Sequence, residues 1–185
     1  AARLWLVLDH YGHERTSLLN GGWQKWIKEG RPVTTEPASF PQGDFKVRRV
    51  QPTVCSAAAV VENLRKPNVV VLDARSPEEY RGERVLGKRG GHIPEAVNVD
   101  WRLNLAGEDV KVFKPAEELK KLYASLGITP DKEVITYCHS GGRAAHALFT
   151  LRLIGFTRAR AYYGSWQEWG ARDDLPIETP IKNRP

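Results

Sequence analysis

A single cysteine, Cys138, lies in the segment of this sequence that is best suited to do chemistry. It stands in VITYCHSGGRA, directly after the β-branched and aromatic run 134–137 and just before an apolar helical pattern. Gly141 and Gly142 permit strained or left-handed angles, so the backbone after the cysteine can turn several N–H groups toward the sulfur. The positive end of the following helix and the charge of Arg143 both favour the ionised thiol. The segment therefore predicts a nucleophilic thiolate at a strand-to-helix turn.

Three residues of this loop also have a plainer interpretation. A free cysteine is usually a buried small apolar side chain, but a Gly-Gly turn that ends in arginine favours the nucleophile for Cys138. His139 either tunes the thiolate or contacts an acceptor, or it is solvated and idle. Ser140 donates a hydrogen bond either to substrate or only to the loop itself. The sequence leaves the roles of His139 and Ser140 open.

A second set of chemically capable residues follows the apolar run 68–73. Asp73 falls at the carboxyl end of this predicted parallel strand, where ligands gather in open α/β sheets, and Arg75 comes two residues later. We expect this pair either to bind a ligand or to form an ion pair that ties the strand to a neighbouring loop. The Pro-Glu-Glu of residues 77–79 predicts the first turn of a short helix and not a catalytic dyad. His92, in GGHIP, is predicted to lock a loop onto the next strand.

The loop CHSGGR and three further segments resemble one known family. In the same order as in the rhodanese (sulfurtransferase) family, the chain carries VVVLDARSPEEYRGE, GHIPEAVNVDW and YYGSWQEWGARDDLPIE, and the resemblance runs from about Gln51 to the C-terminus. It implies that Cys138 accepts a sulfane sulfur, becomes a persulfide, and passes the sulfur to a thiol or cyanide. No cofactor is implied. We assign Cys138 and Arg143 as catalytic, and the substrate-binding set as His139, Ser140, Gly141, Gly142, Asp73 and Arg75.

The spacing within the loop bears on the substrate. Four residues separate Cys138 from Arg143, whereas the related phosphatases of the cell-cycle type have five, which form a wider cradle that fits phosphate. Members of the resembled family that use thiosulfate carry lysine where this chain has Ser140. Those that use 3-mercaptopyruvate have serine there but lack the arginine. We expect thiosulfate as the small anionic donor, with 3-mercaptopyruvate as one alternative and a persulfide-relay or redox-sensing module acting on a protein partner as the other.

Composition and charge agree with an enzyme of small substrates. The chain has 185 residues, 41% of them hydrophobic, which is enough for one ordinary domain and a fragment. The net charge of +6 would suit nucleic acid, but no nucleic-acid module accompanies the scattered basic residues. No stretch is long and apolar enough to span a membrane, so we expect a soluble protein, cytoplasmic or periplasmic. One modest basic cluster, expected to attract an anionic donor, consists of Arg81, Arg84, Lys88 and Arg89.

The second cysteine, Cys55, predicts no chemistry. Two cysteines imply no disulfide framework, and no group of cysteine and histidine has the spacing of metal ligands. Cys55 precedes Ser56, a suitable N-cap for a helix over 57–66, and can pack on Val60 as a hydrophobic staple. We therefore expect an inert Cys55 and no metal site.

An internal repeat accounts for the first fifty residues. The segment LLNGGWQKWIKEGRPVTTEP is similar to AYYGSWQEWGARDDLPIETP, and the same offset aligns Gly12 with Gly155. Residues 1–50 thus resemble the C-terminal remnant of a preceding rhodanese-like domain, followed by an extended linker over 31–51. Residues 51–185 are then a complete catalytic domain. We predict that two tryptophans of each copy are core anchors, namely Trp23 and Trp26, and Trp166 and Trp169.

The apolar side chains of the first copy predict a polypeptide partner. An apolar surface of this size is rare on soluble monomers, so we expect it to be covered by the N-terminal portion of the same protein or by a second copy of the chain. Besides Trp23 and Trp26, the side chains expected in that shared core are Leu4, Trp5, Leu6, Leu8, Leu18 and Leu19.

Alternating strand and helix patterns between the two copies predict the fold that positions these residues. Such alternation is typical of an open parallel sheet with helices on both faces, an α/β fold of rhodanese type, here preceded by a partial domain. It places Cys138 after one strand and before one helix. We expect strands at 69–73, 96–99, 133–137 and 159–163, and helices at 115–126, at 144–154 and from residue 165 onward.

Overall fold

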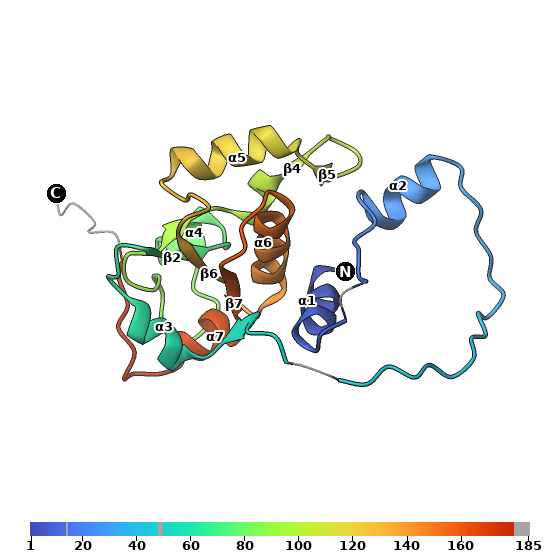
Figure 1. The fold of residues 1–185 in the computed structure, drawn as a ribbon. Helices are drawn as coiled ribbons and strands as arrows, with labels where there is room; N and C mark the ends of the chain where they lie inside the picture. Colours follow the sequence, from blue (N-terminus) through green and yellow to red (C-terminus); the bar gives the residue numbers. More distant parts are fainter. Residues whose placement is uncertain (14, 48–49, 180–185) are drawn as a thin grey trace.

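The computed structural model describes residues 1–13, 15–47 and 50–179, and its centre is a five-stranded parallel sheet (Figure 1). Two strands, β2 (Val69–Asp73) and β6 (Glu133–Tyr137), lie side by side in the middle of the sheet, with Asp73 opposite Tyr137. Both are apolar runs buried on both faces, as parallel strands require. The sheet order is β1-β7-β6-β2-β3, where the outer members are β1 (Val54–Cys55), β7 (Ala159–Tyr162) and β3 (Val97–Asn98).

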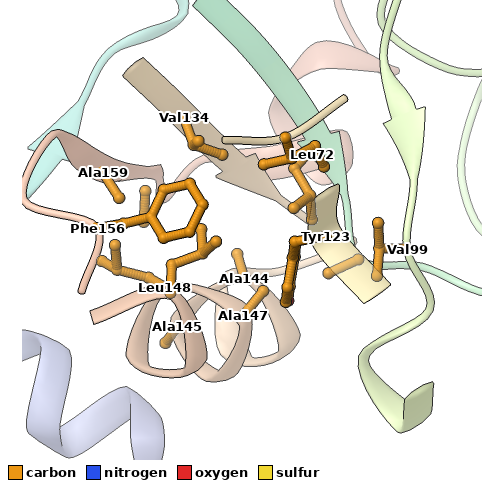
Figure 2. Packing of buried hydrophobic residues seen from close by; sticks show 14 of the residues in the cluster. Leu72, Val99, Tyr123, Val134, Ala144, Ala145, Ala147, Leu148, Phe156 and Ala159 are labelled. Carbon is orange, nitrogen blue, oxygen red and sulfur yellow. The ribbon is translucent and has the colours of Figure 1, made fainter. Parts of the chain in front are cut away.

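Helices cover both faces of this sheet, as the alternating pattern predicts. One face packs on α5 (Ala116–Ser125) and α6 (Gly142–Leu153), where side chains such as Leu72, Tyr123 and Leu148 form one core (Figure 2). The opposite face packs on α3 (Ala57–Asn63) and α7 (Ser165–Trp169) through a second core. The remaining elements are α4 (Pro77–Tyr80), the 3₁₀ turn η1 (Trp101–Asn104), and an antiparallel pair, β4 (Leu105–Ala106) and β5 (Val112–Phe113).

Several element boundaries differ from those expected, each for a local reason. Helix α6 begins at Gly142 and not at residue 144, because Gly141 adopts a left-handed φ of 86° and serves as the N-cap. Helix α3 ends at Asn63 and not at residue 66, since Leu64 is already extended and Pro67 disfavours a helical residue before it. The two-residue strands β1, β4 and β5 were not expected, because so short a strand leaves no periodic pattern.

The N-terminal segment consists of α1 (Ala2–His10) and α2 (Gly22–Lys28), followed by residues 31–47, which form neither helix nor strand. The far end of this segment is bonded back to the end of α1. Gln51 N–H donates to the His10 carbonyl over 2.7 Å, and the Thr53 hydroxyl donates to the Asp9 carboxylate over 2.7 Å. The assignment of residues 1–50 to a preceding domain stays a prediction.

Helix α1 packs on α6, and residues 51–179 are called the sheet domain below. This packing corrects the expected place of two side chains. Trp5 and Leu6 are 8% and 1% exposed and belong to the core shared with α5 and α6, where the Trp5 ring meets Phe149 edge-on at 5.0 Å. They therefore do not belong to a core whose other half is outside the sequence. Within this chain Trp23 is 66% exposed and Trp26 is half-buried, so their role as core anchors, which needs polypeptide outside the sequence, stays a prediction.

Candidate active site

Cys138 lies at the carboxyl end of β6, where the chain turns into α6. The side chain is 1% exposed, and Gly141 N–H donates a hydrogen bond to its Sγ over 3.1 Å. This closure depends on glycine, because a Cβ on Gly141 would meet the Tyr163 ring at 3.0 Å in addition to the cost of the left-handed backbone. Within the described residues the loop therefore turns one N–H group, that of Gly141, toward the sulfur, where the Gly-Gly sequence predicts several.

The start of α7 holds the backbone of this loop. Trp166 N–H donates to the Cys138 carbonyl over 2.9 Å, and Gln167 N–H donates to the His139 carbonyl over 2.8 Å. In the other direction Cys138 N–H donates to the Ser165 hydroxyl oxygen over 3.2 Å, and that hydroxyl donates to the Tyr162 carbonyl. Ser165 is fully buried with a left-handed φ of 54°, a conformation that a side chain rarely adopts without a functional reason. This role of Ser165 was not predicted from the sequence.

Arg143 is held by a carboxylate that the sequence analysis treated only as a helix-capping residue. Its two terminal nitrogens donate to Glu79 over 2.6 and 2.8 Å, and Glu79 is 3% exposed. Glu79 also closes the capping box of α4 with Ser76. Burial is the largest single influence and would raise the pKa of Glu79, but the hydrogen bonds and charge of Arg143, with the Ser76 N–H and the charge of Arg75, together outweigh it and lower that pKa to about 2. The charge of Arg143 is thus largely neutralised by Glu79 at neutral pH.

Asp73 and Arg75 form a buried ion pair beneath the loop, which is one of the two arrangements expected for them, and their assignment as substrate-binding residues stays a prediction. They are 0% and 2% exposed, with a nitrogen-to-oxygen distance of 2.6 Å. Tyr137 donates its hydroxyl to Asp73, and the Arg75 guanidinium lies 4.4 Å from the centre of the Trp166 ring. Their polar atoms are used inside the protein, so the pair ties the ends of β2 and β6 to α7.

His139 is half-buried and Ser140 is exposed. Burial lowers the pKa of His139, so the imidazole is neutral at pH 7, and its Nδ1 makes no hydrogen bond to any of the described residues. Ser140 is exposed, and its carbonyl accepts a hydrogen bond of 2.7 Å from Arg3 of α1. Nothing in these contacts assigns a chemical role to either side chain.

A cavity of about 500 Å³ opens beside the loop, between the sheet domain and the N-terminal segment. Cys138, Ser140, Gly142 and Arg143 line one part of it, whereas His139 does not. Other walls come from residues that the sequence analysis did not associate with the site, namely Arg3, Leu18, Trp101, Lys111, Phe113 and His146.

The aromatic wall of this cavity is well ordered by ring contacts. His146 stacks on Phe113 with ring centres 4.9 Å apart and meets the Trp101 ring edge-on at 5.2 Å. Burial lowers the pKa of His146 to about 4, so this ring is also neutral at pH 7. The cavity therefore combines a sulfur nucleophile with an uncharged aromatic wall and basic side chains.

The basic cluster expected to attract a donor does not line this cavity, which corrects that expectation. Arg89 donates to backbone carbonyl groups of residues 169–175, and Lys88 pairs with Asp173. The contacts of Arg89 and Lys88 fasten the segment after α7, whereas Arg81 pairs with Glu83. His92 is structural, as predicted, because it stacks on Tyr80 at 3.7 Å and its Nδ1 lies 2.9 Å from the Tyr80 carbonyl.

Cys55 lies away from the cavity, next to the N-cap of α3. The Ser56 hydroxyl oxygen accepts a hydrogen bond of 3.3 Å from Ala59 N–H, which confirms the predicted cap. Burial raises the pKa of Cys55 to about 11, so this thiol stays protonated at neutral pH. Over the described ranges, no cluster of three or more His, Cys, Asp and Glu side chains is arranged to hold a metal ion. No helix within those ranges has the length and apolar character needed to cross a bilayer.

Comparisons with known proteins agree on the kind of domain. Residues 56–172 match the family described as Rhodanese-like domain. The chain is 39% identical to the sulfur carrier protein TtuD of Thermus thermophilus over 190 residues and 36% identical to a thiosulfate sulfurtransferase of Azotobacter vinelandii over 178 residues. Each alignment covers 96% of this chain but 66% and 65% of the relative, so the chain spans about two thirds of their length.

Solved structures give a similar result. A structure of EanB in complex with ergothioneine superposes with a TM-score of 0.87 at 27% identity, over 97% of this chain and 45% of that one. The anaerobic ergothioneine biosynthesis enzyme of Chlorobium limicola, in complex with trimethyl histidine, superposes with a TM-score of 0.83 at 26% identity, over 97% of this chain and 45% of that one. Another of these structures is described as holding ergothioneine covalently linked to a persulfide cysteine.

Proposed function

Because this chain belongs to the rhodanese-like domain family, we propose that it is a sulfurtransferase that moves a sulfane sulfur from thiosulfate to cyanide or a thiol through a persulfide on Cys138. The observation that carries the proposal is the 3.1 Å hydrogen bond from Gly141 N–H to Cys138 Sγ beside an open cavity. A backbone N–H that points at the sulfur stabilises negative charge there, both on the thiolate and on the terminal sulfur of a persulfide.

The proposed reaction has two balanced half-reactions. The Cys138 thiolate attacks the outer sulfur of thiosulfate, the sulfur–sulfur bond of the donor breaks, and sulfite leaves with the bonding electron pair. Cyanide then attacks the outer sulfur of the persulfide, the new sulfur–sulfur bond breaks, and thiocyanate leaves as the thiolate is regenerated. The ion pair of Arg143 with Glu79 fixes the first turn of α6 against α4 during both steps.

A second candidate function is that of a persulfide carrier that delivers its sulfur to another protein. One specific observation favours it, namely the 39% identity to a relative named a sulfur carrier protein. The carrier function uses the same persulfide on Cys138 and differs only in the acceptor. Slow turnover with every small acceptor, together with fast transfer to a protein thiol, would favour the carrier.

Intact mass measurement after exposure to thiosulfate tests the shared step. We expect the wild-type chain and Cys55→Ser to gain one sulfur atom and Cys138→Ser to gain none, since Cys55 is a protonated thiol away from the cavity. A gain that persists in Cys138→Ser and disappears in Cys55→Ser would contradict the assignment. Steady-state assays with thiosulfate and with 3-mercaptopyruvate then identify the donor.

We also propose that polypeptide outside this sequence covers the outer side of α1 and α2, and that it is the N-terminal portion of the same protein. Leu4, Leu19 and Trp23 are each more than 60% exposed there, and the curated relatives are about one and a half times as long as this chain. Light scattering after size exclusion and a denaturing gel of the same sample test this. A companion fragment is the expected result, a dimer would indicate a second copy as the partner, and a lone stable monomer would contradict both.

A further inference from the structure

An arginine of α1 contacts the catalytic loop and has no carboxylate partner among the residues that the structure describes. Arg3 donates from Nη2 to the Ser140 carbonyl over 2.7 Å, and the same nitrogen lies 3.5 Å from the Ser140 hydroxyl. It would also lie 3.3 Å from a Cβ built on Gly142, so the guanidinium rests on the first turn of α6. The position of Arg3 is fixed by its neighbours Trp5 and Leu6, which are buried in the shared core.

The charge on Arg3 is available to a ligand, in contrast to that of Arg143. Both terminal nitrogens of Arg143 are bound to Glu79, whereas Arg3 forms no ion pair with any residue that the structure describes. A guanidinium has five N–H donors, and only one nitrogen of Arg3 is engaged by the loop. The remaining donors border the cavity that contains Cys138.

The surroundings of Arg3 favour an anion in this cavity. The N-terminus of α6 carries the positive end of the helix dipole, which repels a cation and attracts an anion. Lys111 also lines the same cavity, so two basic side chains and a helix N-terminus face one space. A donor molecule could therefore place its anionic end beside Ser140 and its sulfur at Cys138, since both residues line this cavity.

We propose that Arg3 binds the anionic end of the sulfur donor, the sulfonate-like group of thiosulfate or the carboxylate of an organic donor, while the donor sulfur faces Cys138. This inference rests on the proposed function for the identity of the donor. It gives the N-terminal segment a part in substrate binding, with α1 contributing the charge and the sheet domain contributing the nucleophile.

Arg3→Gln removes the charge and keeps an amide donor of similar reach, and Arg3→Lys keeps the charge. The matched control is Arg15→Gln, which makes the same change at an exposed arginine of the N-terminal segment that does not line the cavity. We expect the KM for thiosulfate to rise about tenfold in Arg3→Gln, less in Arg3→Lys and not in Arg15→Gln, with kcat nearly unchanged. The difference between Arg3→Gln and wild type should shrink at high salt.

A second measurement is independent of sulfur transfer. Peptide mapping gives the rates at which Cys138 reacts with anionic iodoacetate and with neutral iodoacetamide, and the ratio of the two rates reports the local charge. We expect this ratio to fall at least about threefold in Arg3→Gln and to stay unchanged in Arg15→Gln. An unchanged ratio in Arg3→Gln would overturn the role of Arg3. A fallen ratio in a protein that gains no sulfur from thiosulfate would support the anion site and reject the proposed function.

Discussion

The helices α7 and α2 begin with nearly the same sequence in different surroundings. In α7, GSWQEW, both tryptophans are buried at 2% and 0% exposure, and the first N–H groups bind the catalytic loop. In α2, GGWQKW, Trp23 is 66% exposed, and Trp26 donates its indole N–H to the nearby Pro32 carbonyl. The second core lies beneath α7, whereas α2 has no buried residue. The difference shows that the motif specifies the helix, while its neighbours determine whether the tryptophans are anchors.

One backbone position makes the comparison sharper. Gly22 and Ser165 occupy the same place in the two copies and have nearly the same left-handed φ, 55° and 54°. Glycine adopts this angle at little cost, whereas serine is strained there. The structure shows what the serine provides, because its hydroxyl oxygen accepts the hydrogen bond from Cys138 N–H. The copy beside the catalytic loop thus keeps a strained residue for a specific contact.

The largest difference between the copies should appear when tryptophans are removed. Trp169→Ala empties a fully buried site, and we expect it to lower the free energy of unfolding by about 3–5 kcal/mol. Trp23→Ala should change it by less than about 0.5 kcal/mol, because most of this ring already contacts solvent. Urea denaturation followed by circular dichroism measures both, with Trp169→Phe as a milder variant if the alanine variant does not fold. Equal losses at the two positions would contradict the comparison.

The second expected difference is in acid stability, between Glu79 of α4 and Glu29 at the end of α2. The pKa of Glu79 is about 2, below its ordinary value of 4.5, so its ion pair with Arg143 stabilises the folded state above about pH 4.5. That stabilisation is lost as the pH falls from about 4.5 toward 2, and it amounts to about 3 kcal/mol. In Glu79→Gln the unfolding free energy should therefore depend less steeply on pH in this window.

The matched control for acid stability is Glu29→Gln at the end of α2. Arg31 and Lys25 lower the pKa of Glu29 by hydrogen bonding, but this carboxylate lies at the surface, where solvent and salt screen its ion pairs. Its replacement should leave the acid profile unchanged. If the profile of Glu79→Gln matched that of the wild type, the carboxylate would have no stabilising contact with Arg143.

A smaller effect is expected at Ser165. Ser165→Ala keeps the strained backbone and leaves the buried Cys138 N–H without an acceptor, at a cost of about 2 kcal/mol in stability. Ser165→Gly relieves the strain and should be more stable than the alanine variant. Both variants should lose sulfur transfer to a similar degree, since both lack the hydroxyl, and persulfide formation by intact mass checks this. Normal activity in Ser165→Gly would show that only the backbone angle matters.

The smallest effect is expected for the reverse substitution, Gly22→Ser, at the position of α2 that aligns with Ser165. A Cβ at Gly22 would meet no atom within 4 Å, so the left-handed backbone alone should cost about 1 kcal/mol of unfolding free energy. Urea denaturation measures this cost. A serine that stabilised the protein at this position would indicate a hydrogen-bond partner comparable to the one that Ser165 has.

The central strands and the helices around them could be predicted from sequence because their signals are local. The strands at 69–73 and 133–137 were predicted with their actual bounds, since four consecutive residues in each carry the apolar, β-branched or aromatic pattern. The strand β1 could not be predicted from two residues, because its existence depends on pairing with β7 from the other end of the domain. Whether Trp5 and Trp23 are buried likewise depends on what each helix packs against.

The residues of the candidate site also differ in whether the sequence could predict them. Residues 138–143 are contiguous, so their cradle could be predicted from one motif, whereas Glu79, Ser165 and Arg3 reach the loop from 64, 27 and 137 positions away. No periodicity reports such contacts. A signal for Ser165 existed in the repeat, because a serine stands there where the first copy has glycine. Asp73 and Arg75 were expected at the sheet edge, but sequence alone could not show that they satisfy each other below the surface.

The bonds that join Gln51 and Thr53 to the end of α1 make the segment between them a closed loop. These bonds hold the ends of the loop together. Its length matters little, because each doubling of the length raises the free energy of loop closure by only about 0.6 kcal/mol. A protease cut within residues 31–47 would therefore break one covalent link but leave α1 seated through Trp5 and Leu6. The two pieces would be suited to fragment complementation, in which separately expressed halves reassemble a cavity with Arg3 on one half and Cys138 on the other.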